Sequence, residues 1–314
     1  MDAHFYKSPN LSKDQLQQLI KKSDYPAIPR FILMYSLFLL ACVAVIWTWD
    51  ASWLLFIPAQ AFFGVMICSF FACGHETIHN TAFKSLRLNR VASFLIGLGF
   101  MYPPTMFREL HFAHHRHTHE PGLDPEISFG GRPIPSVVSN LPSYLSWLSG
   151  FPLFIFKVGM VINGALGLPE FVRKNVYPFF DPKVRGSLFV ESWAILLVQL
   201  SILYVALYIH PGFWGYFLGH IVGHSFLASY TAPEHNGLPH EGNILEKTRT
   251  IKASKLVKLI MWNMPYHAEH HAYPAVPFHE LPKLHQIMEQ ELTNNQHSHP
   301  SFHWSIFKKT TVGE

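Results

Sequence analysis

The sequence predicts an all-α integral membrane protein, with four transmembrane helices in two hairpins and a cytoplasmic cap that carries a histidine-rich metal site. Charged residues make up only 14% of the 314 residues and hydrophobic residues 49%, whereas a soluble domain has about 25% charged residues. No Lys or Arg occurs from Phe31 to Phe83 or from Gly186 to Glu246. The third observation is the presence of 21 histidines, eight of which fall in three short clusters.

The two windows without basic residues each contain a pair of apolar stretches. The first window holds 31–49 and 52–72, and the second holds 188–209 and 212–232. Each stretch has about the 20 residues that a helix needs to cross roughly 30 Å of hydrocarbon. The turns between them, WDA and HPG, are very short. Each window therefore predicts a helical hairpin, and together they predict four crossings.

Basic residues flank these stretches on one side only. They precede the first and third stretches and follow the fourth, and neither short turn carries one. The positive-inside rule then predicts that both termini and the two long segments, about 73–187 and 233–314, face the cytoplasm. A net charge of +4 is typical of loops beside anionic lipid and does not indicate a nucleic-acid partner.

Two further apolar segments are not expected to cross. Residues 91–103 are too short, and Pro152 and Lys157 interrupt 144–168. We expect both to be helices that lie in the membrane interface or dip into it. The predicted organisation is a cytoplasmic N-terminal segment (1–30), a membrane domain (31–290) and a poorly ordered C-terminal tail (291–314).

The histidine clusters point to metal chemistry. They are HETIH, HFAHH and HAEHH, and on a helix positions i, i+3 and i+4 share one face. One zinc ion takes four ligands, so eight imidazoles predict two metal ions, and imidazole suits iron. Buried imidazoles without partners would be costly. The predicted ligands are His75 and His79, then His111, His114 and His115, then His267, His270 and His271.

These clusters, in the order HxxxH, HxxHH and HxxHH, resemble the histidine boxes of the membrane fatty acid desaturase family. GHETIHNTAF, HFAHHRHTHEPGLDPE and WNMPYHAEHHAYPAVPFHELPKLH resemble its bacterial members in particular. The resemblance implies a multi-pass protein of the bacterial inner membrane with two iron ions (Fe2+/Fe3+) and O2 as cosubstrate. It also implies a fatty acyl substrate, bound to CoA, a carrier protein or lipid. The electron donor would be separate, such as ferredoxin or a small haem protein with its reductase.

The resemblance further implies a ninth histidine just beyond the fourth span. His235 fits, because it follows that span and precedes His267 by 32 residues. His220 and His224 are the alternatives inside the span. A helix rises about 1.5 Å per residue, so His224 would lie roughly 16 Å from His235 along an unbroken helix. Both could serve one iron only if Pro233 broke the helix sharply, and we expect His235 to be the ligand.

Carboxylates near the boxes are candidates for orienting the ligands. A ligating histidine usually donates its second N–H to such a group, which fixes the ring. Asp124 and Glu126 follow the second box, and Glu234 precedes His235. A solvated loop acid is the alternative for each of them. No catalytic residue is predicted beyond the metal ligands.

The residues leave several functions to compare. A fatty acyl desaturase is the main prediction, and a di-iron hydroxylase or ketolase acting on alkanes, sphingolipids or carotenoids is the alternative. HETIH also matches the HExxH motif of zinc metalloproteases, but spans three and four contain no Asp to complete such a site. A haem protein or metal transporter needs polar groups within the spans, where only His220 and His224 qualify. Cysteine ligation or a disulfide framework is not expected from the three cysteines, Cys42, Cys68 and Cys73.

Overall fold

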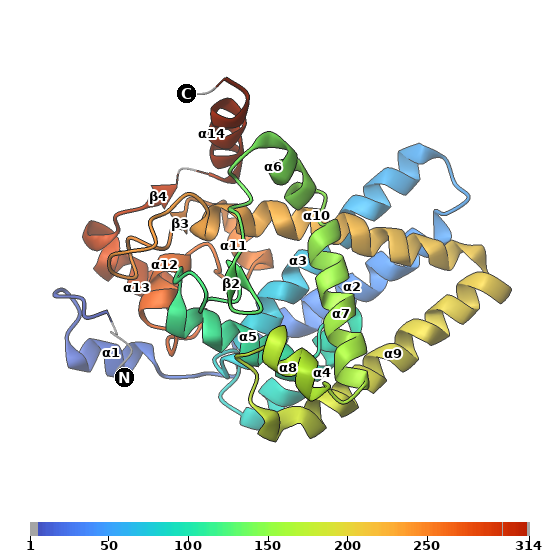
Figure 1. The fold of residues 1–314 in the computed structure, drawn as a ribbon, viewed down its shortest axis with the longest axis horizontal. Helices are drawn as coiled ribbons and strands as arrows, with labels where there is room; N and C mark the ends of the chain where they lie inside the picture. The colour runs from blue at the N-terminus through green and yellow to red at the C-terminus, as the bar shows by residue number, and fades with distance from the viewer. Residues whose placement is uncertain (1–5, 297, 313–314) are drawn as a thin grey trace.

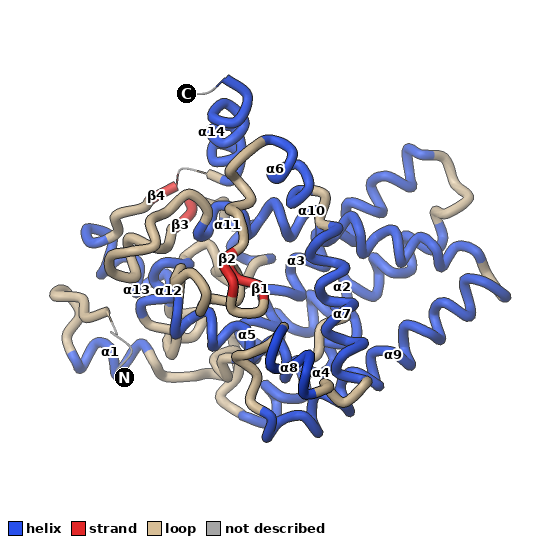
Figure 2. The backbone as a smooth tube through the Cα atoms, viewed as in Figure 1, coloured by secondary structure: helices blue, strands red, loops and turns tan. Residues whose placement is uncertain are grey.

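The structure, a computed structural model, describes residues 6–296 and 298–312 and is built almost wholly of helices (Figures 1 and 2). Strands occur among the described residues only as two short pairs. β1 (Ser128–Phe129) is antiparallel to β2 (Arg132–Pro133), and β3 (Thr250–Ile251) is parallel to β4 (Asn295–Gln296). The helices are α1 (Lys13–Leu19), α2 (Ala27–Trp47), α3 (Trp53–Ile78), α4 (Leu86–Phe100), α5 (Pro104–His117), α6 (Leu141–Leu148), α7 (Phe151–Ala165), α8 (Glu170–Asn175), η1 (Pro182–Val184), α9 (Arg185–Tyr208), η2 (Pro211–Phe213), α10 (Trp214–His235), α11 (Lys255–Ile260), α12 (His267–Ala272), α13 (Leu281–Met288), η3 (Glu289–Glu291) and α14 (His299–Val312).

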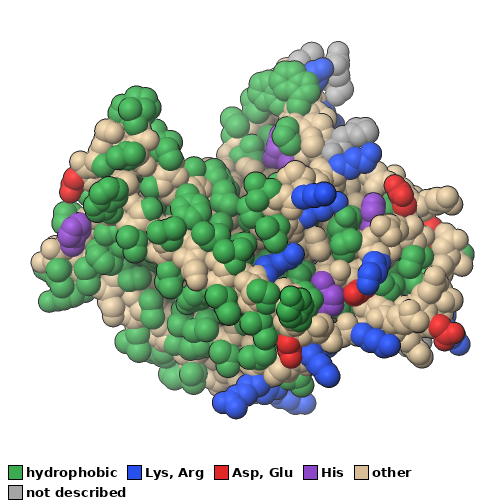
Figure 3. Space-filling view, turned by 180° about the vertical axis from the view of Figure 1, so that it is seen from behind, with side chains coloured by type: hydrophobic (Ala, Val, Ile, Leu, Met, Phe, Trp, Pro, Cys, Tyr) green, Lys and Arg blue, Asp and Glu red, His purple; other side chains and the backbone are tan. Residues whose placement is uncertain are grey.

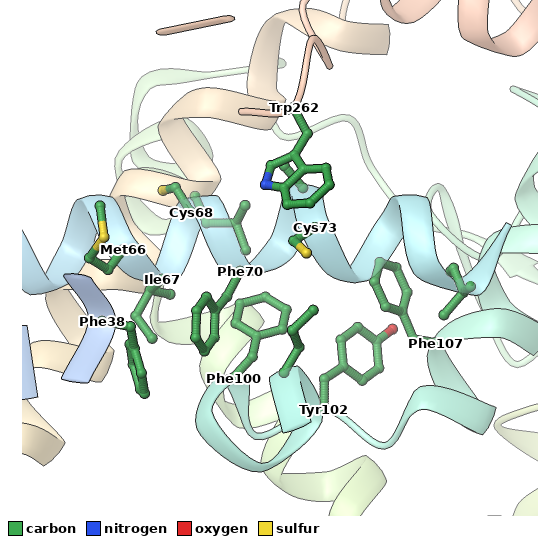
Figure 4. Packing of buried hydrophobic residues seen from close by; sticks show 14 of the residues in the cluster. Phe38, Met66, Ile67, Cys68, Phe70, Cys73, Phe100, Tyr102, Phe107 and Trp262 are labelled. Carbon is green, nitrogen blue, oxygen red and sulfur yellow. The ribbon is translucent and has the colours of Figure 1, made fainter. Parts of the chain in front are cut away.

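Helix α3 lies at the centre of the molecule, with α2, α4 and α10 packed along it. Aromatic side chains fill the space between these helices. Phe38 from α2 and Phe70 from α3 lie with ring centroids 4.2 Å apart, and Phe100 from α4 lies close to Phe70 (Figure 4). All three are buried. The apolar core is therefore arranged around α3, whose last turn carries the first histidine box.

Glycines allow α10 to lie directly against α3. A Cβ on Gly223 would lie 2.7 Å from Cβ of Ile67, and one on Gly219 would lie 2.6 Å from a ring carbon of Phe63. The Gly223–Ile67 contact lies four residues after the Gly219–Phe63 contact on both helices, so α3 and α10 run parallel. Continuing this register to the ends of the helices sets His235 level with the first histidine box.

Three of the four predicted spans are long and apolar enough to cross a membrane. They are the helices Ala27–Trp47, Trp53–Ile78 and Pro182–Tyr208. The fourth predicted span, 212–232, does form a helix, α10, but it lies outside the set that meets this criterion. Its two histidines, His220 and His224, lower its hydropathy. Four crossings and the cytoplasmic cap therefore remain predictions.

The segment predicted to lie in or dip into the interface forms α6 and α7. These two helices are bent by 56° at their junction, the geometry of a broken span or a re-entrant loop. Gly150 stands at the bend with φ of +70°, and a Cβ there would lie 2.1 Å from the backbone nitrogen of Ser225. The indole of Trp147 donates to the carbonyl of Ala228 (3.0 Å). The corner between α6 and α7 is thus fixed against α10.

The surface divides along the long axis of the molecule. On the face seen in Figure 3, hydrophobic side chains cover the half that holds the hairpin ends, and most Lys, Arg, Asp and Glu side chains lie on the other half. Exposed apolar residues of this kind include Leu39 and Leu40 on α2 and Leu197 and Leu200 on α9. An apolar surface of this extent is typical of contact with lipid or another apolar partner.

The C-terminal segment differs from the poorly ordered tail that the sequence predicted. Residues 299–312 form α14, which buries Phe302 and Ile306 in a cluster with Val138, Tyr144 and Ala232. The spacing of Phe302 and Ile306, one helical turn apart, is the signal that the polar composition of the tail obscured.

We expect Gly223→Ala to lower the thermal unfolding midpoint of the purified protein in detergent by roughly 2–6 °C, because overpacking a tight helix contact costs about 1–3 kcal/mol. Gly159→Ala in α7 is the matched control, since a Cβ there has no neighbouring atom within 4 Å. The control should unfold at the same temperature or higher. Equal midpoints for the two variants would contradict the close approach of α3 and α10.

Candidate metal centre

Four helices bring the predicted ligands together. α3 continues beyond the predicted end of its span and carries His75 in its last turn, with His79 as its C-cap. α10 ends at His235. α5 carries the second box and α12 the third. α5 begins with Pro104 at its first position, where the missing N–H of proline costs nothing.

The side chains form two groups. In the first, nitrogens of His75, His79, His111, His115 and His270 all lie within 4.8 Å of one another. Nε2 of His115 lies 2.9 Å from Nε2 of His111 and 3.2 Å from Nε2 of His270. One face of α5 and one residue of α12 thus meet the end of α3.

The second group contains His114, His235 and His271, with nitrogens again within 4.8 Å of one another. Nε2 of His114 lies 3.3 Å from Nε2 of His271. His267 adjoins this group, because its Nε2 lies 2.8 Å from Nε2 of His235. All nine histidines named from the sequence therefore lie in or beside one of the two groups.

Each HxxHH box divides between the groups. In α5 the i and i+4 residues, His111 and His115, belong to the first group and the i+3 residue to the second. In α12 the division is reversed, since His270, the i+3 residue, belongs to the first group. The two boxes with three histidines thus contribute to both groups. The first box contributes only to the first group, and His235 only to the second.

The donor set fits two metal ions. Two nitrogens bound at right angles to one ion, with metal–nitrogen bonds of about 2.0–2.1 Å, lie about 3 Å apart, close to the separations seen here. Both ring nitrogens of His75, and Nε2 of His79, are buried and have no hydrogen-bond partner among the described residues. A buried polar atom without a partner costs about 1–3 kcal/mol. A metal ion in the first group would satisfy one nitrogen of His75 and one of His79, since each imidazole offers one ligand atom.

Most of the ligand histidines have the protonation state that metal binding requires. Burial lowers the pKa of His111, His115, His267 and His271 well below the usual value. Burial also lowers the pKa of His270 to about 3. These imidazoles are therefore neutral at pH 7, which is the form that donates a lone pair to a metal.

His114 is oriented by an acid. Its Nδ1 lies 3.0 Å from both carboxylate oxygens of Asp124. Burial lowers the pKa of His114, but the charge and hydrogen bond of Asp124, together with the charges of Glu126 and Glu234, outweigh burial and raise it to about 9. The N–H at Nδ1 thus faces Asp124, and Nε2 faces the other histidines of the second group. With this pKa the ring is protonated at pH 7 when no metal is bound, so a metal would displace the proton on Nε2. Asp124 also accepts from the backbone N–H of His119 (2.7 Å) and of Glu126 (2.9 Å).

The other two acids that the sequence named lie farther from the ligands. Oε2 of Glu126 is 3.7 Å from Nδ1 of His114, and its side chain is 41% exposed. Oε1 of Glu234 is 3.8 Å from Nδ1 of His267. Of the three acids, Asp124 therefore makes the direct contact.

Two orienting groups escaped the sequence analysis. Nδ1 of His235 donates to the carbonyl of Lys247 (3.0 Å), and Oγ1 of Thr118 lies 3.3 Å from Nδ1 of His271. A backbone carbonyl leaves no signal in the sequence. Thr118 directly follows α5 and could have been suspected, since it ends the helix of the second box.

The alternative ligands in α10 lie elsewhere. Nε2 of His224 is 2.8 Å from Nζ of Lys157, and its Nδ1 donates to the carbonyl of His220 (2.6 Å). Phe100 stacks on the His224 ring with a centroid distance of 6.0 Å. His220 and His224 thus belong to a separate buried polar cluster with Lys157.

Glu76, the acid of the HExxH match, is not placed like a general base. Its side chain is fully buried. One oxygen accepts from the hydroxyl of Thr81 (2.8 Å) and the backbone N–H of Phe278 (3.2 Å). The other lies 3.6 Å from Nδ1 of His75. Glu76 therefore connects the first box to the loop that precedes α13, which gives no support to the metalloprotease alternative.

Comparison with known proteins agrees with this geometry. A family model described as fatty acid desaturase matches residues 51–303. The chain belongs to the fatty acid desaturase family. The predicted resemblance is thus confirmed, and membership makes the chain an oxidoreductase of lipid metabolism. The structure contributes the candidate spans and two histidine groups that could bind metal.

Relatives of this member of the fatty acid desaturase family have names that describe different reactions. A sphingolipid delta(4)-desaturase DES1-like protein of Oryza sativa subsp. japonica is 25% identical over 262 residues, covering 82% of this chain and 71% of that protein. An sn-1 oleoyl-lipid 12-desaturase of Anabaena variabilis is 24% identical over 283 residues, covering 83% and 76%. A zeaxanthin 4-ketolase of Chlamydomonas reinhardtii is 24% identical over 235 residues, covering 73% and 44%.

We expect His235→Gln to lower the metal content from about two ions per chain toward one, because the second group then loses one of its ligands. His224→Gln is the matched control on the same helix and should keep the wild-type content. Elemental analysis of both purified proteins by mass spectrometry measures the difference. Loss of metal from the His224 variant alone would show that the wrong histidine of α10 has been assigned.

We also expect Asp124→Asn to weaken metal binding about 10- to 100-fold, the usual effect of losing an acid that orients a ligand. Glu126→Gln removes a charge close by but no direct contact, and should change the affinity much less. Competition with a chromophoric chelator compares the two. Equal affinities in the two variants would remove Asp124 from its orienting role.

Proposed function

We propose that this protein is an oxygen-dependent fatty acyl desaturase that uses two iron ions held by nine histidines. The observation that supports it most is the pair of imidazole groups, which contain no carboxylate ligand and together offer nine nitrogens. Iron accepts imidazole ligands and, with an open position, is the metal of many oxygen-using enzymes. Bound iron would supply the oxidising chemistry.

The ligands are proposed in two sets. His75, His79, His111, His115 and His270 hold one ion, and His114, His235, His267 and His271 hold the other. Asp124 fixes the ring of His114 and keeps its Nε2 directed at the site. Glu126 and Glu234 lie beside this region without direct contact, and burial raises the pKa of Glu234 well above its usual value.

Apolar residues next to the first group suit a hydrocarbon substrate. Phe107 lies 5.8 Å from the ring of His111 and stacks on Tyr102 at 4.6 Å. Phe71 lies 6.4 Å from the ring of His75. Such a wall excludes water and positions a methylene pair by packing alone.

The reaction balances with an external donor. Removal of two hydrogens from neighbouring carbons, with one O2, two electrons and two protons, gives one double bond and two waters. The electrons come from a separate protein, such as ferredoxin or a small haem protein with its reductase. The acyl group is carried by CoA, a carrier protein or a glycerolipid.

The proposed setting is a bacterial inner membrane. The chain would cross it four times, with its termini and the metal centre in the cytoplasm, as the distribution of basic residues indicates. In this arrangement 1–30 and 291–314 flank the membrane domain 31–290 on the cytoplasmic side.

A second candidate is oxidation of a sphingolipid chain. Sphingolipid delta(4)-desaturases occur among the relatives beside the acyl-lipid desaturases. The same metal groups would serve either substrate, and hydroxylation or ketone formation would need the same ligands. The zeaxanthin 4-ketolase relative favours including these products in any assay.

We expect expression in a host lacking the enzyme, together with a suitable reductase, to produce a new unsaturated lipid detectable by mass spectrometry. His115→Ala should abolish this product, because the first group loses a ligand. His117→Ala changes a neighbouring histidine of α5 that is 36% exposed and pairs with Glu120, and should keep it.

The product identifies the reaction. A hydroxylated or oxo lipid that also depends on His115 would replace desaturation with the alternative oxidation. Undiminished product from the His115 variant would contradict the assignment of the ligands altogether.

A further inference from the structure

Helix α14 contributes no residue to the two histidine groups, so its position needs another explanation. It is attached to the body of the protein through one face only. Phe302 and Ile306 are buried on that face, and Nε2 of His303 donates to the carbonyl of Ser229 (2.9 Å). The ring of His299 stacks on Tyr230 at 4.8 Å.

These contacts fix the level of α14 relative to the membrane. Ser229 and Tyr230 lie at the end of the predicted fourth span, 212–232, on the side of the metal centre. α14 also packs on α6, half of the bent apolar pair that forms a broken span or re-entrant loop. α14 runs across the direction of α3 and α10 rather than along it (Figure 1). A helix at that level and in that direction would lie in the plane of the membrane boundary.

The opposite face of α14 combines aromatic rings with positive charge. Trp304 is 60% exposed and Phe307 45% exposed, and their rings stack at 6.0 Å. Nζ of Lys308 lies 5.5 Å from the Trp304 ring. Positions i, i+3 and i+4 place these three side chains on one face.

The charge of this helix has one sign. Lys308 and Lys309 are its only Lys or Arg residues, and the described part of α14, 299–312, contains no acid. Leu145 on the neighbouring α6 is also exposed. Trp and Phe prefer the boundary between lipid chains and headgroups, and Lys beside them attracts anionic lipid. An acidic protein would match the lysines, but it would leave the level and direction of α14 unexplained.

We propose that α14 is an interfacial helix whose Trp304–Phe307–Lys308 face binds the surface of an anionic phospholipid bilayer. The rings enter the headgroup region, and the Lys308 stem extends along them so that its ammonium group reaches the phosphates. This contact holds α6 and the end of α10 at the membrane boundary. It does not depend on the metal or on the reaction proposed above.

The test uses the full-length protein in nanodiscs made with lipids brominated at defined depths. The emission of Trp304 is the difference between the fluorescence spectra of the parent protein and the Trp304→Phe variant. We expect this emission to be quenched most by lipids brominated near the glycerol end of the chain, and more strongly as the phosphatidylglycerol fraction rises. Lys308→Gln with Lys309→Gln should abolish the dependence on phosphatidylglycerol.

Trp53→Phe provides the control, because Trp53 is exposed at the opposite end of α3. Its quenching should not change when the two lysines are replaced. Emission of Trp304 that is insensitive to bromine at every depth would overturn the proposal and leave a protein partner as the occupant of this face. Equal quenching by lipids brominated at the chain end would overturn it as well, because the helix would then be inserted rather than interfacial.

Discussion

The arrangement of the helices depends most on how the free-energy cost of burying imidazoles beside one another is offset. Nitrogens of different histidines approach within 2.8–3.3 Å at several points, and burial keeps most of the rings neutral. Neutral rings whose lone pairs face each other gain nothing unless a proton or a metal lies between them. Because each buried, unsatisfied nitrogen costs about 1–3 kcal/mol, two bound ions would contribute directly to holding the helices together.

The scaffold meets this constraint with rigid elements. α3 and α10 run parallel in close contact, so the ends that carry His79 and His235 stand at one level. α5 and α12 are short helices whose boxes each serve both groups. The rings are then fixed by contacts such as those of His114 with Asp124 and His235 with the Lys247 carbonyl. A metal site built on helices and supported in this way keeps its geometry better than one built on loops.

Much of this arrangement was predictable because it depends on local periodicity. The spacing of the boxes predicted shared helical faces. The apolar stretches predicted four spans, and three of them form helices that are long and apolar enough to cross a membrane. The spacing could not predict that His114 and His115, adjacent in sequence, belong to different groups, since that depends on how α5 meets α12. The contact of Lys157 with His224 was equally hidden, because it joins helices far apart in the chain.

The fourth span and the tail show where composition misleads. The sequence predicted a span at 212–232, but His220 and His224 leave α10 less apolar than the three candidate spans, although the helix is present and largely buried. Polar residues around Phe302 and Ile306 concealed a helix in the tail that buries these two side chains. In both cases the deciding information was the surface against which the helix packs.

The central claim is that two metal ions lie within the two histidine groups. Diffraction from crystals of the purified protein, with data collected on both sides of the iron absorption edge, tests it directly. The account predicts two anomalous peaks per chain, one among His75, His79, His111, His115 and His270 and one among His114, His235, His267 and His271. A single peak, or a peak beside His220 and His224, would contradict it.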